Sequence, residues 1–327
     1  MSRRTVLASV LFCNCLLTHS APFAYITNQR SHDLSVIDLP LGKVVATVPA
    51  GRSPAGVVAA SAVGTVLVSN PDRKTISVID LRSQTAVDSL SVGAGPVGIE
   101  TSKDGSTLIV SDWYRNRPLV FDTRRRDGAA KELCVGKAPA GVAFAGDGQT
   151  VHVAERDDDS VSMIDLRTQA VKGRVKVGSH PFALLLDEEC ARLYALNVLN
   201  VLNVLNVLSD DVSVVELRSL RVMASLKVGR APYGAALAAN NSLLYVTNLH
   251  GNTVSVIDAN SLELLRTLEG FANPQGVASH GDPVFVLNWM VDCVRVLDAV
   301  SGRALARISS GLNSHGFGAF IGAPPTL

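Results

Sequence analysis

The sequence lacks an excess of charge of either sign. Lysine and arginine together number 30, aspartate and glutamate 29, and the net charge is +1. A chain this close to neutral has no overall field that would draw it onto nucleic acid or an anionic membrane surface. Its basic run Arg124–Arg126 has no aromatic residues beside it on which bases could stack. The sequence therefore predicts no nucleic-acid partner.

Cysteine is scarce as well. If the N-terminal segment is removed, only Cys134, Cys190 and Cys293 remain. An odd number of cysteines cannot pair completely, and no two of them have the spacing of metal ligands. A chain of this length needs no disulfide scaffold to build a core. We predict three buried thiols and no metal site.

Recognisable catalytic motifs are absent from the sequence. It has no Ser-His-Asp set in a familiar local context, and no Cys-x-x-Cys or His-Glu-x-x-His motif. No glycine-rich loop follows a strand and opens a helix, as phosphate binding would require. The sequence therefore favours a non-enzymatic role, and we predict no catalytic residue.

Long hydrophobic runs are missing except near the N-terminus. Val6–Leu17 is apolar but short for a bilayer span, and it follows Arg3 and Arg4. Small residues after it suit cleavage, so residues 1–22 are predicted to be an export signal and residues 23–327 the mature domain. The two arginines fit either an ordinary Sec signal or a twin-arginine signal. Both alternatives place the protein in the periplasm or outside the cell, with no membrane span.

A short sequence motif, called the phrase below, occurs seven times along the rest of the chain. Its first half is proline, a variable residue and glycine, followed by apolar residues, and its second half resembles Val254–Asp258, which reads VSVID. Fixed-period self-similarity is typical of repeat architectures. The copies begin at Pro54, Pro96, Pro139, Pro181, Pro232, Pro274 and Ser314.

Each repeat of about 40 residues contains four short runs rich in β-branched residues, separated by turn residues. Four strands in a unit of this length are typical of a propeller blade. The chain opens at Ala24–Asn28, which matches the second strand of later units, and closes at Ser314–Phe320, which matches a first strand. We therefore predict an all-β, seven-bladed propeller whose C-terminal strand completes blade 1 and closes the ring.

The motifs Leu244–Asn248 (LYVTN) and Asn252–Asp258 (NTVSVID) make the resemblance specific. The mature chain resembles the YVTN-repeat, or YncE-like, β-propeller family over nearly its whole length. The resemblance implies the propeller fold, but it implies no function, because members of the family share no catalytic set.

Residues inside the phrase are predicted to be structural. An acidic residue ends the third strand of every unit, where its side chain can bond backbone donors of the following turn. The glycines of Pro-x-Gly should lie where the innermost strands crowd toward the axis. The acidic positions are Asp38, Asp80, Asp122, Asp165, Glu216, Asp258 and Asp298.

The fifth unit carries nine extra residues within Asn197–Leu208, where Asn-Val-Leu is repeated four times. A period of three fits neither a strand nor a helix. Two interpretations remain open. The insert is a duplication tolerated at a hairpin tip, or it is an apolar finger that docks a partner.

Functional residues are expected in the loops that join the second and third strands and in those that join the blades, because both sets lie on one face of a propeller. Arg52, Lys137 and Arg230 would favour an anionic ligand there, and Trp113 and Trp289 a planar one. Polar and aromatic residues around a concave mouth form a candidate binding site. The predicted site residues are Arg52, Asp112, Trp113, Lys137, His180, Arg230, Trp289 and His315.

Three functions agree with these features. The first is an exported, monomeric binding or interaction module for a protein or a small anionic or planar ligand. The second is an auxiliary redox propeller, which docks to a dehydrogenase or holds a haem-type cofactor through His180 or His315. The third is a lactonase or lyase, whose histidine, glutamate and arginine would come from Glu100, Arg230 and the two histidines. No cofactor is predicted for the first.

Overall fold

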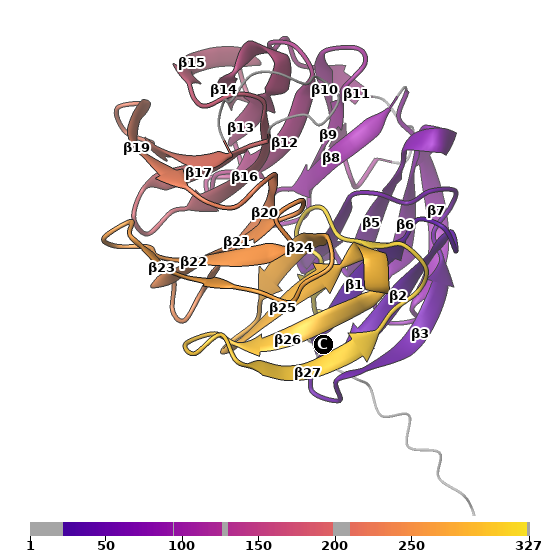
Figure 1. The fold of residues 1–327 in the computed structure, drawn as a ribbon. Coiled ribbons are helices and arrows are strands. Elements are labelled where there is room, and N and C mark those ends of the chain that lie inside the picture. The colour runs from indigo at the N-terminus through magenta and orange to yellow at the C-terminus, as the bar shows by residue number, and fades with distance from the viewer. Residues whose placement is uncertain (1–21, 94, 126–129, 199–209, 326–327) are drawn as a thin grey trace, which may run out of the picture.

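The computed structural model describes residues 22–93, 95–125, 130–198 and 210–325. Seven antiparallel sheets stand around a common axis like the blades of a propeller (Figure 1). Six sheets contain four strands each, and the seventh contains strands from both ends of the chain. The predicted all-β, seven-bladed fold is confirmed.

The strands of each blade are given from the axis outward. In blade 1 they are β28 (Ser314–His315), β1 (Phe23–Asn28), β2 (Asp33–Asp38) and β3 (Lys43–Pro49), with β29 (Ile321–Gly322) also on β1. In blade 2 they are β4 (Val57–Ala60), β5 (Thr65–Asn70), β6 (Thr75–Asp80) and β7 (Thr85–Ser91). In blade 3 they are β8 (Pro96–Thr101), β9 (Thr107–Asp112), β10 (Arg117–Asp122) and β11 (Ala130–Glu132).

Blades 4 to 7 repeat the same order. In blade 4 it is β12 (Pro139–Phe144), β13 (Thr150–Glu155), β14 (Ser160–Asp165) and β15 (Ala170–Lys176). In blade 5 it is β16 (Pro181–Asp187), β17 (Arg192–Asn197), β18 (Asp211–Glu216) and β19 (Arg221–Lys227). In blade 6 it is β20 (Pro232–Ala238), β21 (Leu243–Asn248), β22 (Thr253–Asp258) and β23 (Leu264–Leu268). In blade 7 it is β24 (Pro274–Ser279), β25 (Pro283–Asn288), β26 (Cys293–Asp298) and β27 (Ala304–Ser309).

Helical structure in the described residues is limited to four single turns of 3-10 helix. They are η1 (Ser61–Val63), η2 (Pro71–Arg73), η3 (Arg156–Asp158) and η4 (Trp289–Val291). Three of them, η2 to η4, occupy the hairpins between second and third strands. The described ranges contain no helix with the length and apolar character that crossing a membrane requires.

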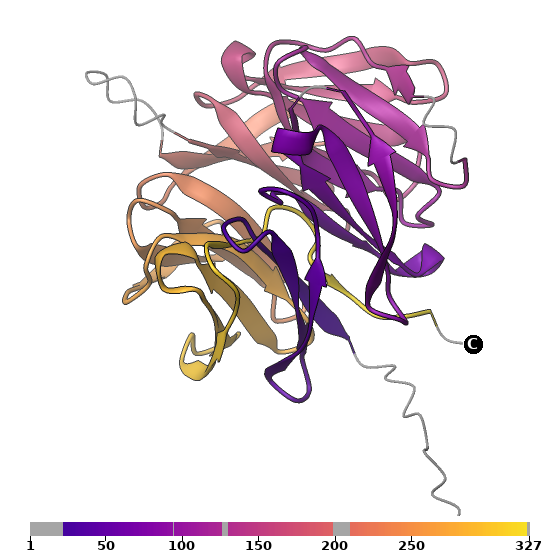
Figure 2. The same cartoon turned by 90° about the vertical axis from the view of Figure 1, so that its right-hand side faces the viewer.

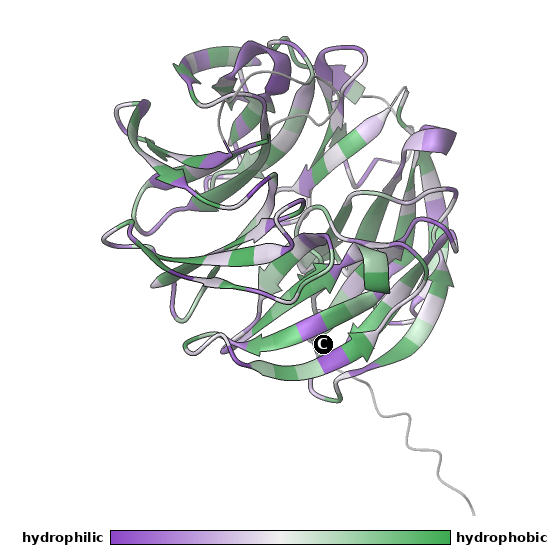
Figure 3. Cartoon of the chain, viewed as in Figure 1, coloured by the Kyte–Doolittle hydropathy of each residue, from purple (hydrophilic) through white to green (hydrophobic). Residues whose placement is uncertain are grey.

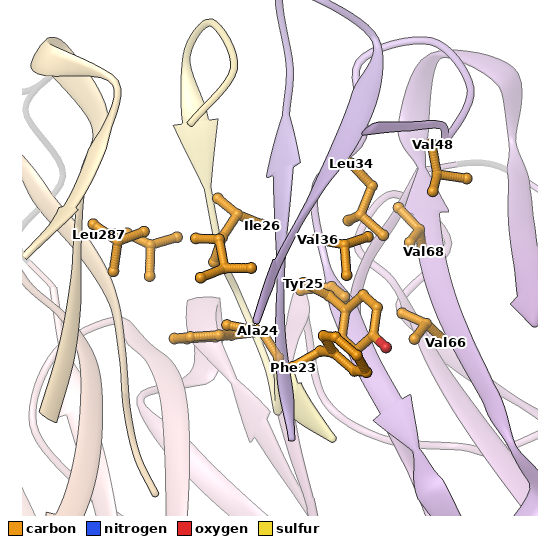
Figure 4. Close-up of a cluster of buried hydrophobic side chains, with 14 of the residues drawn as sticks. Phe23, Ala24, Tyr25, Ile26, Leu34, Val36, Val48, Val66, Val68 and Leu287 are labelled. Carbon is orange, nitrogen blue, oxygen red and sulfur yellow. The ribbon is translucent and has the colours of Figure 1, made fainter. Parts of the chain in front are cut away.

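The core lies between neighbouring blades. The second strand of each blade is almost wholly buried, whereas the outer strands consist mainly of exposed and partly buried residues. Figure 4 shows how β1 serves two interfaces: Ala24 and Ile26 lie on the side of Leu287 in blade 7, and Tyr25 lies on the side of Val66 in blade 2. Apolar residues therefore concentrate along the strands, and most turns are hydrophilic (Figure 3).

The C-terminal segment closes the ring, as predicted. His315 pairs with Thr27 of β1, and Ile321 pairs with Ala24 at the other end of the same strand. Between these points the segment also reaches blade 2, where the Val57 N–H donates to the Phe317 carbonyl over 2.9 Å. The indigo and yellow ends of the chain therefore lie side by side in both views (Figures 1 and 2). The C-terminal segment, which follows blade 7, therefore connects that blade with blades 1 and 2.

Six of the seven acidic residues at the ends of the third strands accept backbone N–H groups of the following turn, as predicted, whereas Glu216 accepts the Ser219 hydroxyl. Asp258 is typical: its Oδ1 accepts the N–H groups of Asn260 at 2.9 Å and Ser261 at 2.8 Å. These bonds favour the ionised form and hold the pKa of the Asp258 carboxyl below its usual value. Among the described residues, no group of three or more histidines, cysteines or acids could hold a metal ion.

The glycines of Pro-x-Gly lie against the backbone of the next blade. A Cβ on Gly98 would stand 2.3 Å from the carbonyl oxygen of Ala140, and one on Gly276 would stand 2.2 Å from that of Gly316. Backbone atoms at the centre of a closed ring cannot move aside easily. The predicted crowding at the axis is therefore confirmed.

We expect Gly98→Ala to lower the free energy of unfolding by about 1–3 kcal/mol, the usual cost of overpacking a rigid site. Ala183→Gly is the matched control, because blade 5 already carries alanine at this position of the phrase. Its effect should stay within about 1 kcal/mol, the range of a strand alanine-to-glycine change. Urea unfolding of both variants measures the difference, and equal effects would contradict crowding as the reason for the glycine.

The three cysteines differ in their exposure. Cys293 is buried, but Cys134 and Cys190 are exposed, so the prediction of three buried thiols is wrong for these two. Cys134 follows the short outer strand β11, and Cys190 lies in a hairpin turn, so neither reaches the packed blade interfaces.

In blade 5, β17 and β18 pair in full register from Arg192↔Glu216 to Asn197↔Asp211. Residues 199–208, most of the Asn-Val-Leu insert, lie outside the described residues.

Candidate functional site

Two faces of the ring carry its loops. The loop face is the one with the second-to-third-strand hairpins, such as residues 113–116, and the inter-blade connections, such as residues 178–180. The far face carries the hairpins between first and second strands, such as residues 188–191. Every inner strand runs from the loop face to the far face, so its proline end and its last residues lie at opposite ends of the channel.

Five aromatic side chains meet at the axis near the loop face. The Phe317 ring lies 4.9 Å from that of Phe182 and 6.0 Å from that of Tyr233. Trp113 extends the group, with its ring 6.2 Å from Phe182, and His315 packs edge-on to Tyr233 at 5.8 Å. We call this group the aromatic plug.

The plug is built from departures from the repeated phrase. Phe182, Tyr233 and His315 occupy the variable position of the phrase, where blades 2, 3 and 4 carry small residues: Ala55, Val97 and Ala140. Phe317 comes from the closing segment, which lacks the usual proline. At this position of the phrase the aromatic side chains come from blades 5, 6 and 1, and blades 2 to 4 contribute only small residues. The plug can therefore fill the axis of the propeller near the loop face.

His315 and Tyr233 form a buried pair within the plug. His315 Nε2 lies 2.8 Å from the Tyr233 hydroxyl. Burial lowers the pKa of His315 to about 4 and raises that of Tyr233, so both side chains are neutral near pH 7. The pair is therefore an uncharged hydrogen bond that fixes the closing strand against blade 6.

The plug and the loop face account for the eight predicted site residues in different ways. Trp113 and His315 belong to the plug, and the Trp113 ring also lies 5.2 Å from the Arg156 guanidinium. Trp289 is partly buried in η4, and among the described residues no ring contact joins it to the plug. Among the described residues, no ring contact joins the remaining five to the plug: Arg52, Asp112, Lys137, His180 and Arg230.

Two of these five have structural partners. Asp112 is 1 % exposed at the end of β9, and its Oδ1 accepts the N–H groups of Tyr114 and Arg115 at 3.2 Å. His180 precedes the phrase at a φ of 54°, and its N–H donates to Asp159 of the neighbouring hairpin over 2.9 Å. Arg52, Lys137 and Arg230 are exposed on the loop face, which leaves them accessible to a partner.

A cavity of about 520 Å³ lies on the axis, on the far-face side of the plug. Six blades contribute to its walls, and Phe317 and Tyr233 of the plug line it as well. About half of its lining surface is apolar, and the glycines of the phrase bring the backbone close to the space. Its volume falls in the range of roughly 300–1,000 Å³ that is typical of small-molecule sites.

The polar lining of the cavity is acidic. Glu100 extends from β8, and Asp187, Glu188 and Glu189 lie at the far-face end of β16 and in its hairpin. Within the described lining there is no lysine, arginine or histidine. Glu188 and Glu189 are tied to neighbouring hairpins, where Glu188 accepts the Gly146 N–H and Glu189 accepts the Asn241 amide.

Glu100 and Asp187 are the two acids without such ties. Burial raises the pKa of Glu100 to about 7, and the bond to its Oε1 comes from the N–H of Thr101 at 3.1 Å. Asp187 is 2 % exposed; its Oδ1 accepts the Cys190 N–H, while its Oδ2 has no hydrogen-bond partner among the described residues. The recorded ion pairs of the described residues include neither acid.

None of the eight predicted site residues lines this cavity. Glu100 alone entered the sequence analysis, as one member of a lactonase-type set. A signal was present, because the fourth residue after the phrase proline is apolar in the other blades: Val58, Ala143, Leu185, Ala236 and Ala278. Glutamate at this position departs from the pattern on an inner strand.

Comparison with known proteins agrees with the fold. Residues 58–147 match the model of the YNCE-like β-propeller family. The predicted resemblance to this family is confirmed over these residues. The comparison with curated proteins gives no significant match to the chain.

Similar solved structures extend the likeness to most of the ring. A Kuenenia stuttgartiensis hydrazine synthase chain has a TM-score of 0.75 at 20% identity and covers 85% of this chain and 92% of its own. A functionally unknown protein from Desulfotomaculum acetoxidans has 0.75 at 12%, with 92% and 99% covered. The dihydro-heme d1 dehydrogenase NirN, in complex with DHE, has 0.69 at 13%, with 90% and 74% covered. At these identities the likeness shows the fold alone.

The cavity does not fit a haem-type group. Within its described lining, no histidine, cysteine or methionine is present to ligate the iron. Haem propionates would also meet the four carboxylates, and like charges in an apolar space repel strongly. Tyr233 lines the cavity, but burial raises the pKa of its hydroxyl and so disfavours the phenolate that would ligate iron. The same hydroxyl lies 2.8 Å from His315 Nε2, so this contact occupies that nitrogen. We therefore derive no step through haem at this cavity.

Proposed function

We propose that the protein is an exported, non-enzymatic binding propeller whose ligand occupies the cavity on the ring axis. The observation that carries the proposal is the cavity itself, which is walled by six blades and ends at the aromatic plug. Inner strands fixed by close backbone contacts form a rigid wall, and a preformed wall loses little entropy when a ligand binds. Export and the non-enzymatic role rest on the sequence, from its N-terminal segment and its lack of catalytic motifs.

The proposal predicts that filling the cavity abolishes binding. Ala319 is an exposed residue that lines the cavity, and its carbonyl accepts the Ala59 N–H over 2.8 Å. Ala319→Leu keeps this backbone bond while it adds three carbons to the space. We expect small-molecule fragments that raise the melting temperature of the wild type to lose their effect on this variant.

Ala62→Leu is the matched control, because Ala62 is exposed in η1 and lies outside the described lining. A thermal-shift screen of a fragment library on the three proteins tests the proposal. It is supported if fragments stabilise the wild type and the control but not Ala319→Leu. Fragments that act on all three proteins alike, or on none, contradict it.

A second candidate function is the docking of a partner protein on the loop face, close to the predicted site residues. One observation favours it: Tyr114 is 80 % exposed and follows Trp113, which lies in the plug. Exposed tyrosine beside a packed tryptophan is typical of interface hot spots. The exposed bases Arg52, Lys137 and Arg230 would then favour an acidic partner.

A further inference from the structure

We propose that the axial cavity selects a small organic cation with an apolar body, for which Glu100 and Asp187 are the counter-ions. The inference rests on the proposed function, because it names the class of ligand for the same cavity. It follows from the charge and the shape of the lining, which are argued in turn.

The charge of the lining is of one sign, and no ion pair among the described residues joins it to a base, although Arg192 stands opposite Asp187 in the strand register. Its charged groups are four carboxylates, and no basic side chain lies among them. Removing a carboxylate from water is costly unless a counter-charge or hydrogen bonds replace the water. Asp187 lacks part of this replacement for water. Its carboxyl is almost fully buried, and one oxygen has no hydrogen-bond partner in the described chain. A bound cation would supply the missing charge and a donor.

The arrangement of the acids favours an organic cation over a metal ion. Metal binding requires several oxygen ligands around one point at about 2.0–2.6 Å. In the part of the chain that the structure describes, no three acidic, histidine or cysteine side chains are grouped closely enough for that. Glu100 projects from blade 3 and Asp187 from blade 5, with blade 4 between them. The negative charge is therefore spread over the wall.

The apolar part of the lining indicates the rest of the ligand. Leu184 and Val277 line the cavity, as does Phe317 of the plug. A hydrocarbon or aromatic body would bury apolar surface there, at about 25 cal/mol per Å². The face of the Phe317 ring can also attract a cation by a cation–π interaction. The cavity disfavours a strongly hydrated anion, because the four carboxylates would repel it and the apolar side chains would not replace its water.

The test compares charged probes with uncharged analogues of the same shape. The probes are phenethylamine with phenethyl alcohol, and choline with its uncharged carbon analogue, titrated into the full-length mature protein by calorimetry at about pH 8, where Glu100 is ionised. We expect each cation to bind at least about tenfold more tightly than its analogue, equivalent to about 1.4 kcal/mol. Glu100→Gln should remove most of this preference. Glu263→Gln, on an exposed loop outside the described lining, should leave it unchanged.

Acidification provides a second readout that a structural effect of the variant would not mimic. Protonation of Glu100 below about pH 7 should weaken the binding of both cations but not that of the alcohol. Asp187, Glu188 and Glu189 are the other charged groups that line the cavity, and both the wild type and the variant keep them. Choline keeps its charge at every pH, so its loss of affinity reports on the protein.

The outcomes separate this inference from the proposed function. Equal binding of cations and uncharged analogues, lost in Ala319→Leu, overturns the inference and leaves the binding cavity in place. Binding of none of the four probes overturns the inference, and the fragment screen then decides the proposed function by itself. Preference for the cations that persists in Glu100→Gln at both pH values also overturns the assignment of Glu100.

Discussion

Deletion of residues 311–327 should lower the melting temperature by more than about 10 °C or prevent folding. The deletion removes β28 and β29, so β1 loses its partner on the axial side, and blade 2 loses its bonds to Phe317 and Ala319. It also removes Phe320, which is fully buried. Truncation of one buried phenylalanine costs about 3–5 kcal/mol, and each kcal/mol shifts the melting temperature of a chain this long by roughly 2 °C.

A shorter deletion is the control for this result. Removing residues 323–327 keeps both closing strands and loses contacts at the edge of the ring, such as the bond from Ala323 to Ser61. Its melting temperature should stay within about 2 °C of the wild type, as for other surface changes. Calorimetry of the two deletions distinguishes ring closure from a general effect of shortening the chain. If the longer deletion melted like the wild type, the C-terminal strand would not be what closes the ring.

The closed ring could be predicted because each blade repeats the same local pattern. The run at Ala24–Asn28 has the pattern of a second strand and the run at Ser314–Phe320 that of a first, and the two do lie together in one blade. The predicted turn role of the acids and the crowding of the glycines depend on local spacing and on the symmetry of the ring, and both were confirmed. The exposure of Cys134 and Cys190 depends on where each turn ends, and the periodicity of the repeat does not determine that.

The cavity could not be predicted by the same means. Its lining combines residues from six blades at several levels of the channel, and the phrase alone does not give the side on which each inner-strand residue projects. β-bulges at the start of the inner strands, as between Pro96 and Ile99, shift the alternation that a regular strand would have. The departures from the phrase nevertheless lie where the structure is most distinctive. Glu100, Phe182 and Tyr233 all replace residues that are small or apolar in most other blades.

Glu100→Gln should stabilise the protein at alkaline pH and leave its stability almost unchanged at acidic pH. Glutamine keeps the acceptor for the Thr101 N–H and the shape of the side chain, and it removes the charge. The pKa of Glu100 rises from 4.5 to about 7 because burial disfavours the ionised carboxyl. Between these pH values the folded protein retains a proton that the unfolded chain releases, so wild-type stability falls as the pH rises through this window. Above about pH 7 the penalty is complete, on the order of 3 kcal/mol at 1.36 kcal/mol per pKa unit.

The measurement is the difference in melting temperature between the variant and the wild type at about pH 8 and about pH 4.5, on either side of the window. We expect a gain of roughly 6 °C at the higher pH, from about 2 °C per kcal/mol, and a gain near zero at the lower pH. The carboxylates of Asp187, Glu188 and Glu189 face the same cavity and are present in both proteins, so their own contributions cancel and only their repulsion with the Glu100 charge enters the difference. Glu263→Gln, on an exposed loop, should show no pH-dependent gain. A gain of the same size at both pH values would mean that the charge of Glu100 is already compensated, and the cavity would then have no need of a cation.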